Sequence, residues 1–400
     1  MDSLTQITLG AAVGEIALGR KVGNKAMLWG AIGGTIPDLD VVANLVTDQI
    51  SAMAFHRGIT HALFFGILAP LILGWLIYAF YDVEHRSQFW KKLLMAYSAL
   101  FLLLFLGSLP MPIPRMEIVS IAWIVSTAII AFPTVLYLIS KKKPLEERPT
   151  WKGWALLFFL SIITHPLLDA CTAYGTQLLQ PFSDYRVAWN NIAVVDPIYT
   201  FPFLFFLIWA SRKTRTSDRR KWLNYLGIGI SSAYLLFTFM NKMQVDNAFR
   251  QAMEEQEISM SRFTTGPSIF NNILWQGVAE GDSLYHYGRY SLWDEQAPFA
   301  QMNQIGKGHE YLKPFENDRV IKILKWFSNG YYCVKPLPEG KLEFSDMRYG
   351  TFPMGDGSEG FIFQFILEPK DGKIVAEQVR PEDRNMEGAF TQLWERIKGI

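Results

Sequence analysis

The chain has little cysteine and no excess of charge of either sign. Its two cysteines, Cys171 and Cys333, lie far apart and form no CxxC pair, so neither a disulfide framework nor a cysteine-based zinc site is expected. A net charge of +1 provides no basic field of the kind that attracts nucleic acid. No nucleic-acid partner is therefore expected.

The N-terminus lacks the positively charged segment that opens a signal peptide. The acidic Asp2 precedes a short apolar stretch, which ends at Arg20 and Lys21. We expect this first segment to stay in the mature protein.

What the chain has in abundance is long apolar runs, all within its first 240 or so residues. Residues 62–80, 118–139 and 222–240 carry no charge and reach the ~20 residues that cross a bilayer. Residues 93–109 and 154–170 are predicted spans as well, whereas 198–210 is too short to cross alone. Residues 4–19 and 26–36 are rich in glycine and alanine, which predicts a tight hairpin of two helices.

The orientation in the membrane follows from the loops. Alternate loops carry seventeen Lys and Arg residues on one side and three on the other. Because positive loops stay in the cytoplasm, residues 37–61, residues 171–197 and everything after residue 242 are predicted to face outward.

Beyond residue 241 the composition becomes that of a soluble domain. Residues 319–326, 330–334 and 360–367 are β-branched and aromatic and are separated by Gly, Pro and Asp, which predicts strands. A polar helix is expected near residues 245–258. The predicted fold is a polytopic α-helical membrane domain (1–241) followed by a small β-rich (α+β) extracytoplasmic domain (242–400).

Ionisable residues in the apolar region fall into a few tight clusters at predicted span ends, where such groups are costly and tend to serve function. The candidate metal ligands are Asp2, Asp38, Asp40, His56, His61, His165 and Asp169. His165 and Asp169 are four residues apart and share one helical face, and the predicted topology places all seven at the outer boundary. Imidazoles with carboxylates favour zinc over manganese or iron, with room for two ions.

Each of these residues also has a structural explanation when taken singly. Asp2 or Asp38 can cap a helix, and a lone histidine beside a span is often an interfacial residue. The joint placement of His56, His61, His165 and Asp169 favours metal binding.

Several motifs in order resemble one known family. They are the opening Met1 to Thr5, residues 37–40 (PDLD), residues 56–61 (HRGITH), and residues 165–169 (HPLLD) followed by Tyr174-Gly175 and residues 181–183. Over residues 1–210 the chain resembles the YdjM family, described as membrane-bound, metal-dependent hydrolases. Asp196 also resembles a family position. One departure is Gln6, where the family usually has histidine, so either one metal site is weakened or an amide fills a ligand position.

The resemblance implies a distant relation to zinc-dependent phospholipase C and to clustered-zinc nucleases. The predicted function is hydrolysis of a lipid or lipid-linked phosphoester at the outer membrane surface, with Arg57 and Asp40 as candidate catalytic residues. A zincin protease is excluded because His309-Glu310 is followed by Lys313 where HExxH needs histidine. A non-enzymatic metal-binding channel or assembly factor is the alternative.

Aromatic residues cluster with two histidines in the second domain. These residues are His286, His309, Trp275, Tyr285, Tyr287, Tyr290 and Trp293. They form either a surface that faces a substrate or lipid, or ordinary core packing.

The charge asymmetry of the loops is directly testable. In a cysteine-free variant in intact cells, a cysteine at Ser51 or Ser183 should react with an impermeant thiol reagent, and one at Ser217 should not. Labelling at Ser217 alone would invert the predicted orientation.

Overall fold

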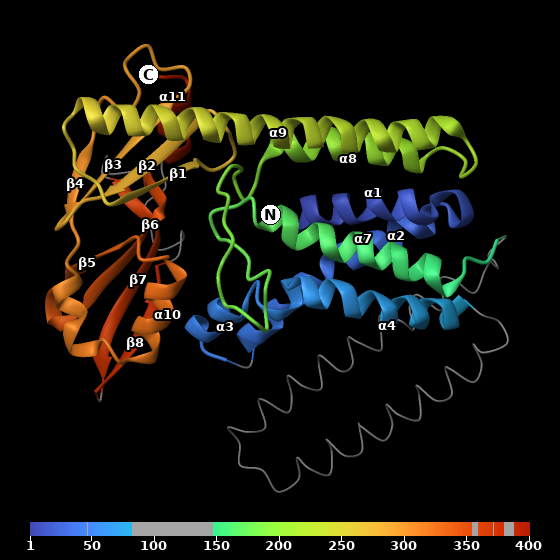
Figure 1. Cartoon of the computed structure of the whole chain (residues 1–400), viewed down its shortest axis with the longest axis horizontal. Coiled ribbons are helices and arrows are strands. Elements are labelled where there is room, and N and C mark those ends of the chain that lie inside the picture. The colour runs from blue at the N-terminus through green and yellow to red at the C-terminus, as the bar shows by residue number, and fades with distance from the viewer. Residues whose placement is uncertain (46, 82–146, 354–358, 371, 380–387) are drawn as a thin grey trace, which may run out of the picture.

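The computed structural model describes residues 1–45, 47–81, 147–353, 359–370, 372–379 and 388–400. The predicted spans 93–109 and 118–139 lie outside the described residues. The chain forms a helical N-terminal region followed by a domain with two antiparallel sheets (Figure 1).

The first two helices form the predicted tight hairpin. Helix α1 (Ser3–Val22) turns at Gly23, which has φ of +60°, into α2 (Asn24–Thr35). The two backbones approach so closely that a Cβ atom on Gly10 would lie 2.3 Å from the carbonyl oxygen of Gly30. Small residues permit this contact, as expected for helices that pack within a membrane.

Further apolar helices lie beside this hairpin: α4 (Leu63–Tyr81), α7 (Trp151–Asp169), α8 (Pro197–Ser211) and α9 (Asp218–Glu255). In the described part of the chain, α4, α7 and α9 are long and apolar enough to cross a membrane, whereas α8 is shorter. Apolar helices of sufficient length therefore form at three of the predicted spans, and α8 is short, as predicted.

The described basic loops gather at one end of this bundle. The α1–α2 turn, the start of α7 and the α8–α9 connection lie together there (Figure 1). Arg220 at this end is buried and pairs with Glu15 at 2.6 Å, tying α9 to α1. The last turn of α7 and the first residues of α1 lie at the opposite end, beside the C-terminal domain.

Helix α9 is one continuous element of 38 residues. The polar helix predicted near 245–258 is confirmed as far as Glu255, but it continues the apolar span instead of forming an element of its own. Val245, Phe249 and Met253 recur at intervals of four and pack against Trp275 of the second domain. The predicted domain boundary at 241/242 falls inside α9, which runs from the bundle into the C-terminal domain (Figure 1).

The C-terminal domain contains two four-stranded antiparallel sheets, each with its strands in sequence order. The first comprises β1 (Arg262–Pro267), β2 (Leu274–Glu280), β3 (Leu284–Ser291) and β4 (Asn303–Gly306). The second comprises β5 (Tyr332–Pro336), β6 (Leu342–Pro353), β7 (Glu359–Lys370) and β8 (Lys373–Gln378). The predicted strands at 330–334 and 360–367 correspond to β5 and β7. The short helices η3 (His309–Phe315), η4 (Pro338–Gly340) and α11 (Ala389–Ile397) complete the domain.

The strand predicted at 319–326 is wrong. These residues form helix α10 (Arg319–Phe327), which Asp318 caps by accepting a hydrogen bond from the Val320 amide. The buried residues Val320, Ile321, Leu324 and Phe327 follow helical spacing. The β-branched composition misled the prediction, whereas the period of the apolar positions was that of a helix.

The aromatic group of the C-terminal domain divides between core and surface. Trp275 and Tyr285 are fully buried and serve packing, whereas Trp293 is 54% exposed. His309 stacks on Tyr332, with ring centroids 4.1 Å apart, and its Nε2 lies 3.0 Å from the Tyr332 carbonyl oxygen. Core packing therefore accounts for Trp275, Tyr285 and His309.

The close approach of α1 and α2 predicts a matched pair of mutational effects. Gly10→Ala should lower the free energy of unfolding by about 1–3 kcal/mol, because the new methyl group meets backbone atoms. Gly229→Ala in α9 meets nothing within 4 Å and should be neutral or slightly stabilising. Thermal unfolding in detergent measures both, and equal midpoints would contradict the packing described.

Candidate metal centre

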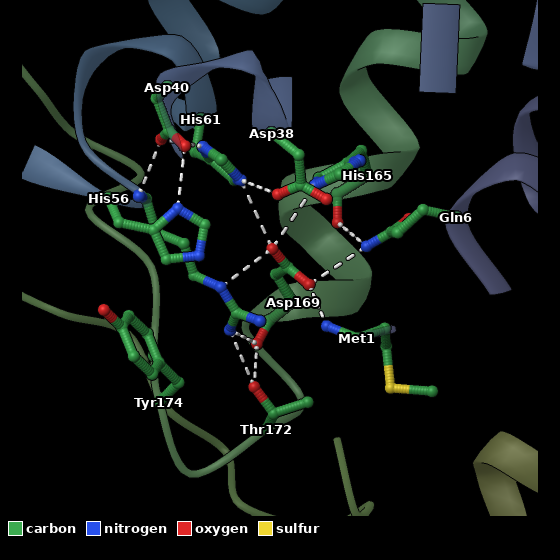
Figure 2. Close-up of polar contacts among 12 residues, drawn as sticks. Met1, Gln6, Asp38, Asp40, His56, His61, His165, Asp169, Thr172 and Tyr174 are labelled. Carbon is green, nitrogen blue, oxygen red and sulfur yellow. Dashed lines mark hydrogen bonds and ion pairs between the residues drawn. The ribbon is translucent and has the colours of Figure 1, made fainter. Parts of the chain in front are cut away.

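Three short elements and the end of one helix carry six of the seven candidate ligands. The 3₁₀ helix η1 (Pro37–Leu45) presents Asp38 and Asp40, and α3 (Gln49–Phe55) ends at His56. The 3₁₀ helix η2 (Ile59–His61) contributes its last residue. The last turn of α7 brings His165 and Asp169 to the same place (Figure 2).

Four of the predicted ligands converge. The Nε2 atom of His61 lies 3.4 Å from Asp38 Oδ1 and 3.4 Å from Asp169 Oδ2. The Nε2 atom of His165 lies at the same two distances from the same two oxygens. Ligand atoms of all four residues lie within 4.8 Å of one another. The structure thus confirms the convergence of these four residues.

The outer nitrogens of both histidines are held by other groups. His165 Nδ1 lies 2.5 Å from the carbonyl oxygen of Gly34, so this nitrogen donates and Nε2 keeps its lone pair. His61 Nδ1 lies 3.3 Å from Asp40 Oδ2. The Nε2 atoms of both rings and Asp169 Oδ2 are buried without a hydrogen-bond partner. A cation site requires buried polar atoms of this kind, which face one point and have no hydrogen-bond partner.

The local electrostatics also favour a cation. Burial alone would raise the pKa of Asp38, but the imidazoles of His165 and His61 beside its carboxylate hold that pKa well below its usual range. Burial alone would lower the pKa of His61, but the carboxylates of Asp169, Asp38 and Asp40 beside its ring raise it to about 9. The carboxylates thus attract a proton to His61, and a divalent cation competes for the same position.

Arg57 occupies a constrained position beside the four ligands. Its backbone has φ of +60°, unusual for a residue with a side chain, and its amide donates to Asp40 Oδ2 at 2.9 Å. Its Nε lies 3.1 Å from Asp169 Oδ2 and its Nη1 donates to Thr172 at 2.9 Å. The guanidinium therefore lies next to a ligand oxygen, as the prediction of a catalytic role requires.

Asp40 and His56 form an outer pair. His56 Nδ1 lies 2.7 Å from Asp40 Oδ1, while Asp40 Oδ2 also accepts from Thr60 at 3.1 Å. With Asp38 these two residues make a second group whose ligand atoms lie within 4.8 Å. In this arrangement Asp40 orients His61 and His56.

Asp2 and Asp196 are both placed as helix caps. Asp2 accepts from the Thr5 amide at 3.0 Å at the start of α1, and it belongs to neither group of converging ligand atoms found among the described residues. Asp196 caps α8 and accepts from the Tyr234 hydroxyl at 2.9 Å.

Gln6 lies against the ligand set. Its Nε2 donates to Asp169 Oδ1 at 3.0 Å and to the His165 carbonyl oxygen at 3.2 Å. The amino group of Met1 also contacts Asp169 Oδ1. Gln6 therefore donates hydrogen bonds to a ligand, and this contact orients Asp169.

Sequence reasoning missed some of the supporting groups. The Gly34 carbonyl and the Thr172 hydroxyl belong to residue types that carry no signal of their own. Tyr174 lies beside the site, with its ring centroid 5.4 Å from that of His56. Its signal in the sequence was the Tyr174-Gly175 pair, which follows residues 165–169 in the family resemblance.

Proton competition at His61 predicts that metal binding depends on pH. Below pH 9 a bound cation must displace the His61 proton, so apparent affinity for Co²⁺ should fall by about tenfold for each unit of decrease. Spectroscopic titration of the purified protein at pH 6, 7 and 8 measures this. An affinity independent of pH would contradict the role of His61.

Comparison with known proteins identifies a family. The family model of the YdjM inner membrane protein matches residues 1–245, which is more than half of the 400-residue chain and includes all four converging ligands. Searches of curated proteins and of solved structures found no match. The chain therefore belongs to the YdjM inner membrane protein family.

Proposed function

We propose that the chain is a metal-dependent hydrolase that cleaves a phosphoester of a lipid or lipid-linked substrate at the outer membrane surface. The observation that carries the proposal is the convergence of His61, His165, Asp38 and Asp169 on one point, with both Nε2 atoms unpartnered. A buried cluster of this kind is costly unless a cation balances it.

Zinc fits the separations between the four atoms. Ligands about 2.0–2.1 Å from a tetrahedral zinc ion lie about 3.3–3.4 Å from one another. Four of the nitrogen-to-oxygen separations in the cluster are 3.4 Å. The carboxylates of Asp38, Asp40 and Asp169 outnumber the two cations beside them, the Arg57 guanidinium and the Met1 amino group, when the histidines are neutral, which favours a bound cation.

The chemistry divides between the ion and the chain. Zinc supplies a nucleophile at neutral pH by lowering the pKa of a bound water to about 7. Arg57, beside Asp169, is placed to stabilise negative charge that develops on a phosphoryl group. Asp40 holds the rings of His61 and His56, and with Asp38 and His56 it offers a second ion position.

The surroundings of the centre support an amphipathic substrate. Leu39, Val41, Val42 and Leu45 on η1 are exposed apolar side chains next to the ligand Asp38. Phe182 is 85% exposed, and its ring centroid lies 6.4 Å from that of Phe64 at the start of the apolar helix α4. Apolar side chains at the end of a membrane bundle suit contact with lipid.

The outward orientation of the centre belongs to the same proposal. The basic loops occupy the opposite end of the bundle (Figure 1). A centre on the outer face would meet lipid headgroups of the outer leaflet.

Removal of one ligand tests the proposal. His165→Ala should abolish stoichiometric metal binding and hydrolysis of lipid phosphodiesters, because it removes an Nε2 atom that lies 3.4 Å from both Asp38 and Asp169. Metal analysis and release of the headgroup, after chelation and readdition of Zn²⁺, measure the two effects. Asp169→Asn should also lose metal but should destabilise the protein by about 3–5 kcal/mol, because it strands Arg57.

The matched control is His309→Ala, which removes a histidine of the C-terminal domain and should leave metal content unchanged. Stoichiometric metal without hydrolysis of any lipid phosphoester would favour the alternative, a metal-binding protein that is not an enzyme. Wild-type protein that takes up no divalent metal would end the proposal.

A further inference from the structure

The C-terminal domain holds the segment that leads into His56. Ile50 of α3 is 2% exposed and packs in the core of that domain with Leu312 and Ile321. Beside it, Arg319 of α10 pairs with Asp48 at 2.8 Å. Helix α3 is therefore anchored on the C-terminal domain at Ile50, six residues before the candidate ligand His56.

The same domain also holds the segment that follows Asp169. Arg348 of β6 is buried, pairs with Asp346 at 2.6 Å, and donates to the carbonyl oxygen of Ala173 at 3.2 Å. The ring of Phe327 of α10 packs edge-on against Tyr174, with centroids 5.0 Å apart. The segment that leads into His56 and the segment that follows Asp169 thus both contact the C-terminal domain.

Tyr174 connects this surface to the site. The guanidinium carbons of Arg57 and Arg186 each lie 4.7 Å from its ring centroid, within the range of a cation–π contact. Its hydroxyl donates to the carbonyl oxygen of Met53 in α3. One side chain therefore contacts Arg57, α3 and, through Phe327, the C-terminal domain.

We propose that Tyr174 is a positioning residue through which the C-terminal domain fixes Arg57 beside the metal centre. A cation bound to Asp169 Oδ2 would share the carboxylate charge and repel the guanidinium 3.1 Å away. The ring of Tyr174 and the hydroxyl of Thr172 then keep Arg57 in place. This inference rests on the proposed role of Arg57 in binding a phosphoryl group.

The test separates metal binding from anion binding in the full-length protein in detergent. Co²⁺ is titrated first, and inorganic phosphate is then titrated into the Co²⁺-loaded protein, both followed by the visible Co²⁺ absorption. Tyr174→Leu should keep the Co²⁺ affinity within about threefold and weaken phosphate binding by about tenfold or more, the loss expected when a charge-assisted hydrogen bond no longer forms. Tyr174→Phe keeps the ring and should behave as wild type.

Two further variants guard against a general loss of stability. Tyr331→Leu removes a ring that lies 4.1 Å from the Arg262 guanidinium within the C-terminal domain, and it should leave both affinities unchanged. Phe327→Leu loosens the contact with Tyr174 from the other side and should weaken phosphate binding by a few fold.

The outcomes distinguish a failure of the proposed role of Arg57 from a failure of its positioning by Tyr174. If Arg57→Ala weakens phosphate binding and Tyr174→Leu does not, the positioning role is overturned and the proposed function stands. If Arg57→Ala leaves phosphate binding intact, the proposed role of Arg57 fails and the inference fails with it. Equal losses in Tyr331→Leu and Tyr174→Leu would reduce Tyr174 to a packing residue.

Discussion

The buried carboxylate of Asp169 is the group on which the site depends. It lies at the end of an apolar helix, where an unpaired charge would be costly, and the surrounding structure supplies partners from several directions. Oδ2 faces His61, His165 and Arg57, while Oδ1 accepts from Gln6. Because these partners come from α1, η2 and α7, satisfying one carboxylate brings separate parts of the bundle together.

The close packing of α1 on α2 makes this arrangement feasible. Glycines at the contact let the backbones touch, so the Gly34 carbonyl comes within reach of His165 and Gln6 comes within reach of Asp169. The Gly34 carbonyl oxygen binds Nδ1 of His165 and the Asp40 carboxylate binds Nδ1 of His61, so Nε2 of each histidine faces the centre. Helix α9 joins the bundle to the C-terminal domain, and Phe327 of that domain contacts Tyr174 beside the candidate metal centre.

Much of the site was predictable because its chemistry is unusual for its surroundings. Carboxylates and imidazoles beside apolar runs stand out, and the four-residue spacing of His165 and Asp169 already placed them on one helical face. The role of Asp40 was less accessible, because an orienting carboxylate and a ligating one look the same in a sequence. Asp2 was equally ambiguous, since an aspartate that caps a helix and an aspartate that binds a metal cannot be told apart in a sequence.

The sequence by itself determined the apolar helices, the two-part organisation, the residue types of the metal centre and the resemblance to one family. These follow from local properties: length, hydrophobicity, spacing and motif order. Only the tertiary structure decided that α10 is a helix, that α9 is continuous, and that Tyr174 lies between the centre and the C-terminal domain. Those features depend on contacts between residues far apart in the chain. Local composition does not determine which distant surface a side chain will contact.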